Sequence, residues 1–477
     1  MAAPLLGAVA HPKLLVLVVI EQFRPETLEI VAGQLGPNGF KKFYEHGACF
    51  PDCRHLASTF SASSIATLAT GGWPAQHGLV ADSWYSAALG RTVSAAASEL
   101  RATTLAAQLA ADARSRGFVI SLEEAPGAIF AGSNSIPRFW INEQGAFSTQ
   151  PEAPAWLEAY NRQRPIENLH GAEWRAWGAR PDAPPLRRLQ FDASKPEEFI
   201  NLYKASPFAQ DAQFDFAGEL IRQERLGQGD TSDFLCVISS SSALLGYETG
   251  GRSPLMAQMV LRLDQHLGYL FEALTRTVGE GNFTLVVTGA HGAPPAPDQS
   301  ARVSMAVPGE VIAQSVQKAL AAGGAGAVVK YVYPFLYLDT SGFRDAEVVR
   351  VAAGKAAMER PEVAAYFTAG GSSSETNDWI VRFRNSFYPR RSGDVMLAYA
   401  PERVEDYGRG YGVSYGSLYN YDVRVPLFFY GPQFRPGFCE SPVESVDVTA
   451  TMARLLGTSQ PSSATGRVLG EAFTREP

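Results

Sequence analysis

Residues 286–292 read Val-Val-Thr-Gly-Ala-His-Gly, an apolar run that leads into a turn. The run 283–288 predicts a buried strand. Gly289 and Gly292 flank Ala290 and His291, which predicts a tight turn at the carboxyl end of that strand. A lone histidine in such a turn can act as a ligand, or it can simply donate a hydrogen bond to a backbone carbonyl.

Short apolar runs alternate with helical stretches along most of the chain. Strands are predicted at 14–20, 118–122, 234–239, 283–288, 395–399 and 425–430, and helices at 39–46, 63–70, 103–116, 254–275 and 448–456. Asp447 is the expected N-cap of the last helix. This alternation is typical of a parallel sheet that is covered by helices on both faces.

Two regions interrupt the alternation. Residues 131–200 are rich in Pro, Trp and Asn and are interpreted as a surface excursion of the core. Residues 301–391 contain their own predicted helix (310–322), strand (328–338) and helix (345–358) and are interpreted as an inserted cap subdomain. The core is therefore expected to comprise residues 12–300 and 392–475.

Composition excludes several classes of protein. Of 477 residues, 46% are hydrophobic and 19% charged, which indicates a large core and excludes global disorder. A net charge of −7 disfavours a nucleic-acid binder. The apolar run 14–20 is too short to cross a bilayer, so no transmembrane segment is expected. The protein is expected to be cytoplasmic, or periplasmic or secreted if a leader peptide has been removed.

The four cysteines do not form a zinc module, because only Cys49 and Cys53 are close together in the sequence. These two residues can form a local disulfide or remain free thiols. Cys236 lies in an apolar strand and is expected to be a packed thiol.

Several segments together resemble the alkaline phosphatase superfamily, and most closely its type I phosphodiesterase/nucleotide pyrophosphatase-like members. They are residues 18–25, 39–48, 59–71, 77–80, 84–85, 262–264, 281–292, 391–395 and 421–432, which follow the family's order. The resemblance implies an α/β three-layer sandwich, with a mostly parallel sheet between helices and an inserted cap subdomain.

In active relatives, two zinc ions about 4 Å apart activate a nucleophile that precedes a helix. By resemblance the nucleophile is Ser61, and the ligand after the first strand is Glu21, one methylene longer than the family's Asp. The family's Asp-x-x-x-His falls on Ala243 and Tyr247, its Asp-His pair on Ala290 and His291, and its late histidine on Tyr415 or Arg424. The substrate-binding Asn falls on Asp82, and the phosphate-holding Lys and Arg of the monoesterases fall on Glu123 and Ala125.

This set of residues is poor in negative charge. Two dications about 4 Å apart repel each other by roughly 16 kcal/mol at an effective dielectric constant of 20. Glu21, with only marginal contributions from Asp82 and Glu123, cannot offset that repulsion, so no resident metal or other cofactor is expected. Two alternatives remain open: a single zinc held by Glu21, Ser61 and His291, and a metal-free set in which His291, oriented by Glu21, activates Ser61.

The leading functional hypothesis is a catalytically degenerate homologue, a pseudoenzyme that binds an unknown protein or small molecule. The alternative is a hydrolase of phosphate, sulfate or carboxylic esters that acts through Ser61 with one metal or none. A third hypothesis is a structural subunit of a larger complex, with 131–200 as its interface.

Overall fold

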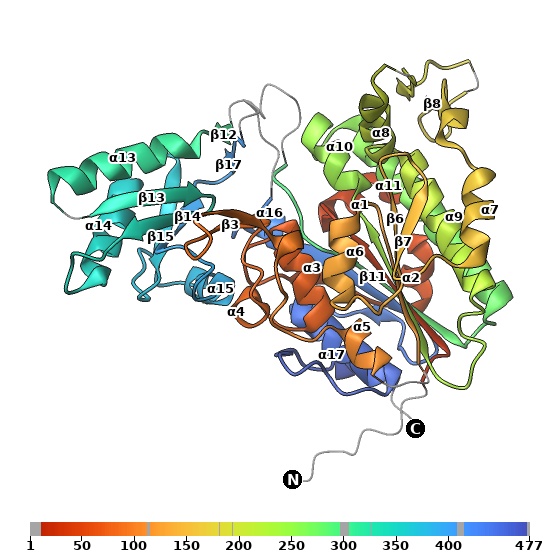
Figure 1. The fold of residues 1–477 in the computed structure, drawn as a ribbon. Helices are drawn as coiled ribbons and strands as arrows, with labels where there is room; N and C mark the ends of the chain where they lie inside the picture. Colours follow the sequence, from red (N-terminus) through yellow and green to blue (C-terminus); the bar gives the residue numbers. More distant parts are fainter. Residues whose placement is uncertain are drawn as a thin grey trace, which may run out of the picture.

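The computed structural model describes residues 11–111, 115–180, 182–192, 194–295, 305–324, 326–407 and 415–474. A ten-stranded sheet lies at the centre of the larger lobe, in the order β19-β2-β18-β11-β1-β10-β5-β6-β7, with β20 beside β2 (Figure 1). Its strands are β1 (Leu14–Ile20), β2 (Ala48–Arg54), β5 (Gly117–Ser121), β6 (Arg138–Ile141), β7 (Phe147–Gln150), β10 (Asp233–Ser239), β11 (Phe283–Gly289), β18 (Arg424–Tyr430), β19 (Gly437–Phe438) and β20 (Val443–Glu444). β11, β1, β10, β5 and β6 run parallel to one another, whereas β18 is antiparallel to β11 and β2.

The central strand β1 shows why the sheet has two buried faces. All seven of its residues are buried, and alternate side chains point to opposite faces. Leu15, Leu17 and Val19 belong to one apolar cluster, and Leu14, Val16, Val18 and Ile20 belong to the other. Such a strand is stable only between two layers of helices.

Helices supply those two layers (Figure 1). One cluster is completed by α3 (Ser61–Thr70), α5 (Leu105–Ala110), α6 (Glu124–Ala131) and α17 (Ser445–Leu456). The other is completed by α1 (Pro25–Val31), α2 (Phe40–His46), α7 (Ala155–Arg162), α8 (Pro196–Lys204), α9 (Pro207–Gln223) and α11 (Pro254–Thr277), and α10 (Ser241–Thr249) packs on α11. The predicted α/β fold with a mostly parallel sheet is confirmed.

A second lobe lies to one side of the core (Figure 1). Its four-stranded sheet has the order β13-β14-β16-β15, and α13 (Gly309–Ala322) and α14 (Ala346–Met358) pack against it. The strands are β13 (Ala327–Val332), β14 (Phe335–Asp339), β15 (Val363–Thr368) and β16 (Val395–Tyr399). This sheet therefore takes β16 from residues that the sequence assigns to the core. The short strands β12 (Ala306–Val307) and β17 (Val404–Glu405) pair in parallel.

Several smaller elements complete the structure. The hairpin β3 (Ser83–Ser86) and β4 (Arg91–Ser94) contacts β13 of the second lobe. The others are α4 (Pro74–His77), α15 (Trp379–Ser386), α16 (Asn420–Val423), β8 (Glu173–Trp174) and β9 (Arg187–Arg188).

Four details of the sequence interpretation are corrected. The predicted strand 328–338 is the hairpin β13–β14, because Tyr333 and Pro334 form a turn between two strands. The excursion 131–200 is not confined to the surface, since it contributes β6 and β7 to the central sheet. The helix expected at 103–116 is α5, and residues 112–114 of that prediction lie outside the described part. Asp447 occupies the third position of α17, where it forms a capping box with Glu444.

The remaining whole-chain expectations concern cysteines and membranes. Cys49, Cys53 and Cys236 are free, buried thiols, so the alternative of a local disulfide is excluded. None of the described helices has both the length and the apolar character needed to cross a lipid bilayer.

Candidate active site

The candidate residues meet at the carboxyl ends of three neighbouring parallel strands. Glu21 directly follows β1, His291 lies two residues after β11, and a serine run follows β10. The Glu21 amide donates to the Ser239 carbonyl (3.1 Å) and the Ala290 amide to the Ile20 carbonyl (2.9 Å), so the three strand ends are joined by backbone bonds. In open α/β sheets this edge is where ligands bind.

The turns after β1 and β11 are held together by close backbone approaches. Gln22 has a φ of 54°, which turns the chain sharply after Glu21. The Phe23 amide then donates to the His291 carbonyl (2.9 Å), and the Gly292 amide donates to the Asp422 carbonyl (2.7 Å). A β-carbon on Gly292 would collide with the Tyr421 carbonyl oxygen, which explains the glycine of the motif at 286–292.

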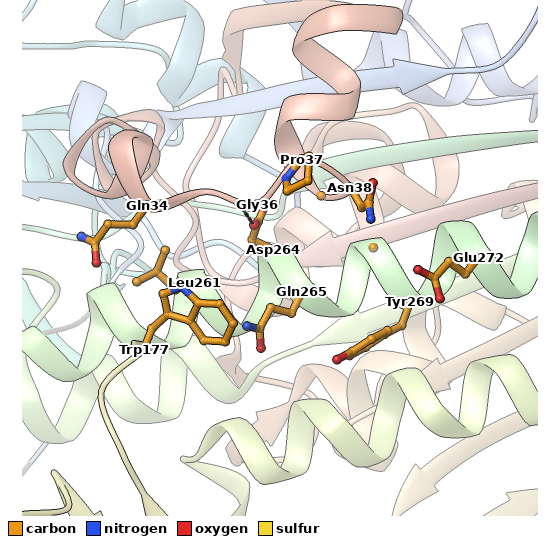
Figure 2. Close-up of a pocket in the computed structure, with 12 residues that line it drawn as sticks. Gln34, Gly36, Pro37, Asn38, Trp177, Leu261, Asp264, Gln265, Tyr269 and Glu272 are labelled. Carbon is orange, nitrogen blue, oxygen red and sulfur yellow. Dashed lines mark hydrogen bonds between the residues drawn. The ribbon is translucent and has the colours of Figure 1, made fainter. Parts of the chain in front are cut away.

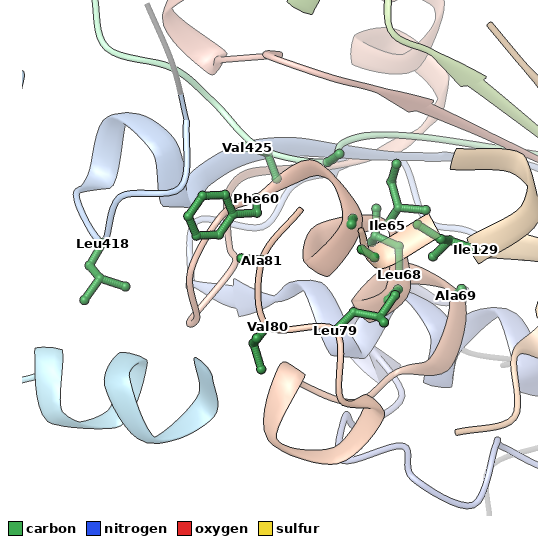
Figure 3. Close-up of a cluster of buried hydrophobic side chains, with 14 of the residues drawn as sticks. Phe60, Ile65, Leu68, Ala69, Leu79, Val80, Ala81, Ile129, Leu418 and Val425 are labelled. Carbon is green, nitrogen blue, oxygen red and sulfur yellow. The ribbon is translucent and has the colours of Figure 1, made fainter. Parts of the chain in front are cut away.

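Ser61 is the first residue of α3, and apolar packing fixes the position of that helix. Figure 3 shows Phe60, Ile65, Leu68 and Ala69 of this region among side chains from neighbouring segments. Gly71 ends the helix in the left-handed conformation, with a φ of 69°. The N-terminal turn of a helix presents free amides and a positive dipole, so the Ser61 hydroxyl lies where an anion is favoured.

Ser61, Glu21 and His291 are in contact. The Ser61 hydroxyl donates to Glu21 Oε1, and His291 Nε2 lies 3.7 Å from the same oxygen. His291 Nδ1 lies 2.8 Å from the Gly292 carbonyl, so this nitrogen carries a proton and donates it there. These three residues come from separate segments of the chain, and the structure brings them together.

The pKa shifts in this trio follow from the contacts. Burial by itself raises the pKa of Glu21, but His291, Ser240 and Ser61 together lower it below its usual value. Burial lowers the pKa of His291, but Glu21 and the Gly292 carbonyl outweigh that effect and raise it. Glu21 therefore favours the protonated form of His291, and His291 favours the ionised form of Glu21.

The Asp82 carboxylate lies at the N-terminus of α3, where the helix amides and dipole favour an anion. Its Oδ1 accepts a hydrogen bond from the Ala62 amide at 2.8 Å. Burial raises the pKa of Asp82 to about 6, although the Ala62 hydrogen bond opposes the shift and nearby Glu21 adds to it. Asp82 therefore carries a negative charge at neutral pH close to where an anionic substrate is expected.

Aromatic rings cover His291. The Tyr415 ring centroid lies 4.0 Å from that of His291, and the Tyr247 ring lies 5.7 Å from that of Tyr415. Arg424 lies elsewhere: its guanidinium contacts Glu26 (3.4 Å) and the Pro51 carbonyl (3.2 Å). Of the two positions expected for the late histidine, only Tyr415 adjoins the trio.

The structure also describes Ala290, Ala243 and Glu123, three of the other expected positions. Ala290 is buried beside His291, and Ala243 is buried in the first turn of α10. Glu123 immediately precedes α6 and lies 3.7 Å from Lys204 in an ion pair.

Two contributors were missed by sequence reasoning. Ser242 donates its hydroxyl to the Glu21 carbonyl (2.5 Å), and the run of four serines at 239–242 was the available signal. Asp422 is completely buried, and burial raises its pKa to about 6 despite a hydrogen bond from Ser417 and the charge of His291. Its proximity to His291 depends on tertiary contacts, so no local pattern predicts it.

A pocket of about 230 Å³ lies away from these residues, along α11 (Figure 2). Trp177, Tyr269 and Asp264 are among its lining residues, and none of Glu21, Ser61 or His291 is. The Asp264 carboxylate already accepts hydrogen bonds from the Gly36 and Phe40 amides, at 2.7 Å each.

Curated relatives match almost the entire chain. Alkaline phosphatase PhoV of Synechococcus elongatus is 25% identical over an alignment of 517 positions, and the alignment covers 97% of this chain and 93% of that protein. Alkaline phosphatase PafA of Elizabethkingia meningoseptica is 24% identical, with coverages of 98% and 96%. A Myroides odoratus protein named as a calcium-transporting ATPase is also 24% identical, with coverages of 97% and 95%.

These relatives overturn the leading functional hypothesis. The expectation of a pseudoenzyme is wrong, because full-length relatives are named alkaline phosphatases and nothing in the comparisons indicates a loss of activity. That expectation rested on the number of zinc-ligand positions that are substituted in this chain. It gave too little weight to the Ser61 hydroxyl and the Glu21 carboxylate, which the structure places in direct contact.

Solved structures and the family profile agree on the fold. The crystal structure of wild-type alkaline phosphatase PafA superposes with a TM-score of 0.83 at 22% identity, covering 98% of this chain and all of that one. Murine ectonucleotide pyrophosphatase/phosphodiesterase 5 superposes with a TM-score of 0.56 at 14% identity, with coverages of 94% and 95%. The family described as Type I phosphodiesterase / nucleotide pyrophosphatase matches residues 15–403, and the chain belongs to this family of the alkaline phosphatase superfamily.

Proposed function

We propose that the protein is a phosphoric ester hydrolase in which Ser61 is the nucleophile. The observation that carries the proposal is the contact between the Ser61 hydroxyl and the Glu21 carboxylate at the N-terminus of α3. A base within hydrogen-bond reach is one way to activate a serine hydroxyl as a nucleophile. The phosphatase names of the full-length relatives support the same class of substrate.

The chemistry follows from the order of the contacts. As Ser61 Oγ forms a bond to phosphorus, its proton passes to Glu21, and the bond from phosphorus to the ester oxygen breaks. Protonated Glu21 gives that proton to the leaving oxygen as the alcohol departs, which restores its carboxylate. Water then attacks the phosphoserine and passes a proton to Glu21, the bond from phosphorus to Ser61 Oγ breaks, and the proton returns to Ser61 Oγ as inorganic phosphate leaves.

The surroundings of Ser61 are suited to the charge of the transition state. The amides and dipole of the first turn of α3 favour the equatorial phosphoryl oxygens. His291 Nε2 lies 3.7 Å from Glu21 Oε1, and the protonated ring, which this contact favours, would partly neutralise the developing negative charge. Glu21 has a lowered pKa and is therefore a weak base, so we expect slow turnover compared with a two-metal phosphatase.

Only two side-chain donors, Glu21 and His291, would be available to one divalent cation, and the described residues contain no group of three or more His, Cys, Asp or Glu placed to hold a metal ion. Ligands that lie about 2 Å from a shared ion can be no more than about 4 Å apart, and Glu21 Oε1 and His291 Nε2 are 3.7 Å apart. His291 Nε2 is buried without a hydrogen-bond partner among the described residues, and it would have to lose its proton to bind such an ion. An ion there would polarise a phosphoryl oxygen and acidify the Ser61 hydroxyl. Ala243 and Ala290 offer no donor atom for a second ion.

Hydrolysis of 4-nitrophenyl phosphate tests the proposal, with bis(4-nitrophenyl) phosphate, 4-nitrophenyl sulfate and 4-nitrophenyl acetate as the other ester classes. We expect the phosphates to be the best substrates and Ser61→Ala to lower kcat/KM at least about 1,000-fold. Ser64→Ala is the matched control, since this buried hydroxyl lies on the same helix and has no hydrogen-bond partner among the described residues. Wild-type activity in Ser61→Ala would refute the proposal. Faster turnover of 4-nitrophenyl acetate than of the phosphates would show that carboxylic esters are the substrate class.

A further inference from the structure

A second hollow lies beside the β3–β4 hairpin and is lined by several arginines. It has a volume of about 550 Å³ and is bounded by the β3–β4 hairpin, the segment 98–101 and the segment 388–391 after α15. We call it the arginine pocket, because Arg91, Arg101, Arg390 and Arg391 all line it. Glu99 is its only acidic lining residue, in a chain whose net charge is −7.

Two of these arginines have structural partners. Arg391 donates to the carbonyls of Gly78 and Glu99 at 2.7 Å each, and its guanidinium stacks 5.0 Å from the Trp84 ring. Arg101 forms an ion pair with Glu99 at 2.8 Å, which neutralises the single acid of the pocket. The remaining positive charge in the hollow is therefore not compensated by carboxylates that line it.

The other two arginines are free to bind a ligand. Among the described residues, Arg91 and Arg390 form no side-chain hydrogen bond or ion pair, and both are exposed. Arg390 also has a φ of 71°, a conformation that costs energy in any residue other than glycine. Backbone strain of this kind persists where the surrounding structure fixes it and is concentrated at functional sites.

We propose that the arginine pocket binds a small ligand carrying two or more phosphate groups, at a site separate from Ser61. Arg91 comes from the hairpin and Arg390 from the segment after α15, so two guanidinium groups on different walls face one hollow. Each guanidinium can bind phosphate oxygens through two parallel hydrogen bonds, and two of them match two phosphates better than one. The volume lies within the range of small-molecule sites, and none of Glu21, Ser61 and His291 lines the pocket.

Calorimetric titration with inorganic tripolyphosphate tests the assignment. All variants carry Ser61→Ala so that the probe is not hydrolysed. We expect R91Q/R390Q to weaken tripolyphosphate binding at least about tenfold, because both free guanidinium groups are lost. The matched control is R276Q/R344Q, which removes the same charge from two exposed arginines outside the pocket and should leave the affinity within about twofold.

The remaining measurements separate this proposal from its rivals. Inorganic phosphate should bind at least about tenfold more weakly than tripolyphosphate if two phosphates are recognised together. Equal losses of tripolyphosphate affinity in the two double variants would show that binding depends on net charge, and this would overturn the proposal. So would unchanged binding in R91Q/R390Q, which would place the probe in the Ser61 site. A single-stranded oligonucleotide that displaces tripolyphosphate at equal phosphate concentration would overturn the assignment to a small ligand.

Discussion

At the scale of single residues, Glu21 shows how one methylene can change the chemistry of a site. It leaves β1 just before the turn at Gln22, and its longer arm brings Oε1 to the Ser61 hydroxyl on α3. A carboxylate in that position can accept the serine proton directly. The same oxygen lies beside His291, so a single atom couples the nucleophile to the imidazolium.

Shortening or neutralising this side chain should therefore impair catalysis to different degrees. Glu21→Asp draws the carboxylate back by about 1.5 Å and should lower kcat about 100-fold, because misplacing a catalytic group by 1 Å costs about that much. Glu21→Gln keeps the length but removes the base and the charge, and should lower kcat further. Steady-state kinetics on 4-nitrophenyl phosphate measures both, and a fully active Glu21→Gln would exclude Glu21 as the base.

Asp82 predicts a pH-dependent affinity for anionic substrates. Its pKa is raised to about 6, so it is charged above that pH and repels a phosphate at the start of α3. Asp82→Asn removes the repulsion and should lower KM by about threefold to tenfold at pH 8, with little effect at pH 5. The ratio of KM values for wild type and variant, measured between these pH values, should change around pH 6. A ratio that does not vary with pH would contradict the prediction.

At the scale of elements, the turn after β11 depends on close backbone contact. Gly292 packs against the carbonyl of Tyr421, and its amide bonds to the carbonyl of Asp422. Gly292→Ala should therefore displace His291 or the segment 421–424. We expect a loss of about 1–3 kcal/mol in the free energy of unfolding, measured by urea denaturation, together with lower activity.

Gly33→Ala is a suitable comparison for that variant, because a β-carbon at Gly33 would meet no atom within 4 Å. We expect the two substitutions to differ clearly in stability. Equal stability of both variants would show that the turn after β11 can relax around an added methyl group.

The sequence predicted buried strands well and interrupted ones poorly. β1 and β16 have the predicted bounds, because continuous apolar runs specify a strand that is covered on both sides. The run 328–338 contains a turn at Tyr333 and Pro334 that apolar character conceals, so the hairpin β13–β14 was missed. β6 and β7 were also missed, since the Pro- and Trp-rich composition around them resembles that of a loop.

The candidate site was predictable in part for a related reason. Glu21, Ser61 and His291 each follow a recognisable local pattern at a strand end or a helix start, and the resemblance assigns their roles. Asp422 and the choice between Tyr415 and Arg424 depend on which segments meet in space. Local sequence patterns do not predict which distant segments of the chain contact each other.

At the scale of the whole molecule, the two lobes are joined by paired segments. β12 and β17 lie side by side where the chain enters and leaves the second lobe. Glu405 of β17 accepts hydrogen bonds from the hydroxyls of Tyr331 and Tyr399, at 2.7 and 2.6 Å. This buried network ties the connection to the second sheet.

Asp422 should make the stability of the whole molecule depend on pH. Its folded-state pKa is raised from 3.8 to about 6, so the folded protein holds this proton more tightly than the unfolded chain does. The resulting stabilisation is complete below about pH 4 and is lost as pH rises through 6. Asp422→Asn is neutral throughout and retains an oxygen for the Ser417 amide. Between pH 4 and pH 7, the free energy of unfolding of the variant should therefore rise relative to wild type by about 1–3 kcal/mol. Urea denaturation at several pH values measures this difference, and parallel curves for the two proteins would show that the folded protein does not hold the Asp422 proton more tightly than the unfolded chain does.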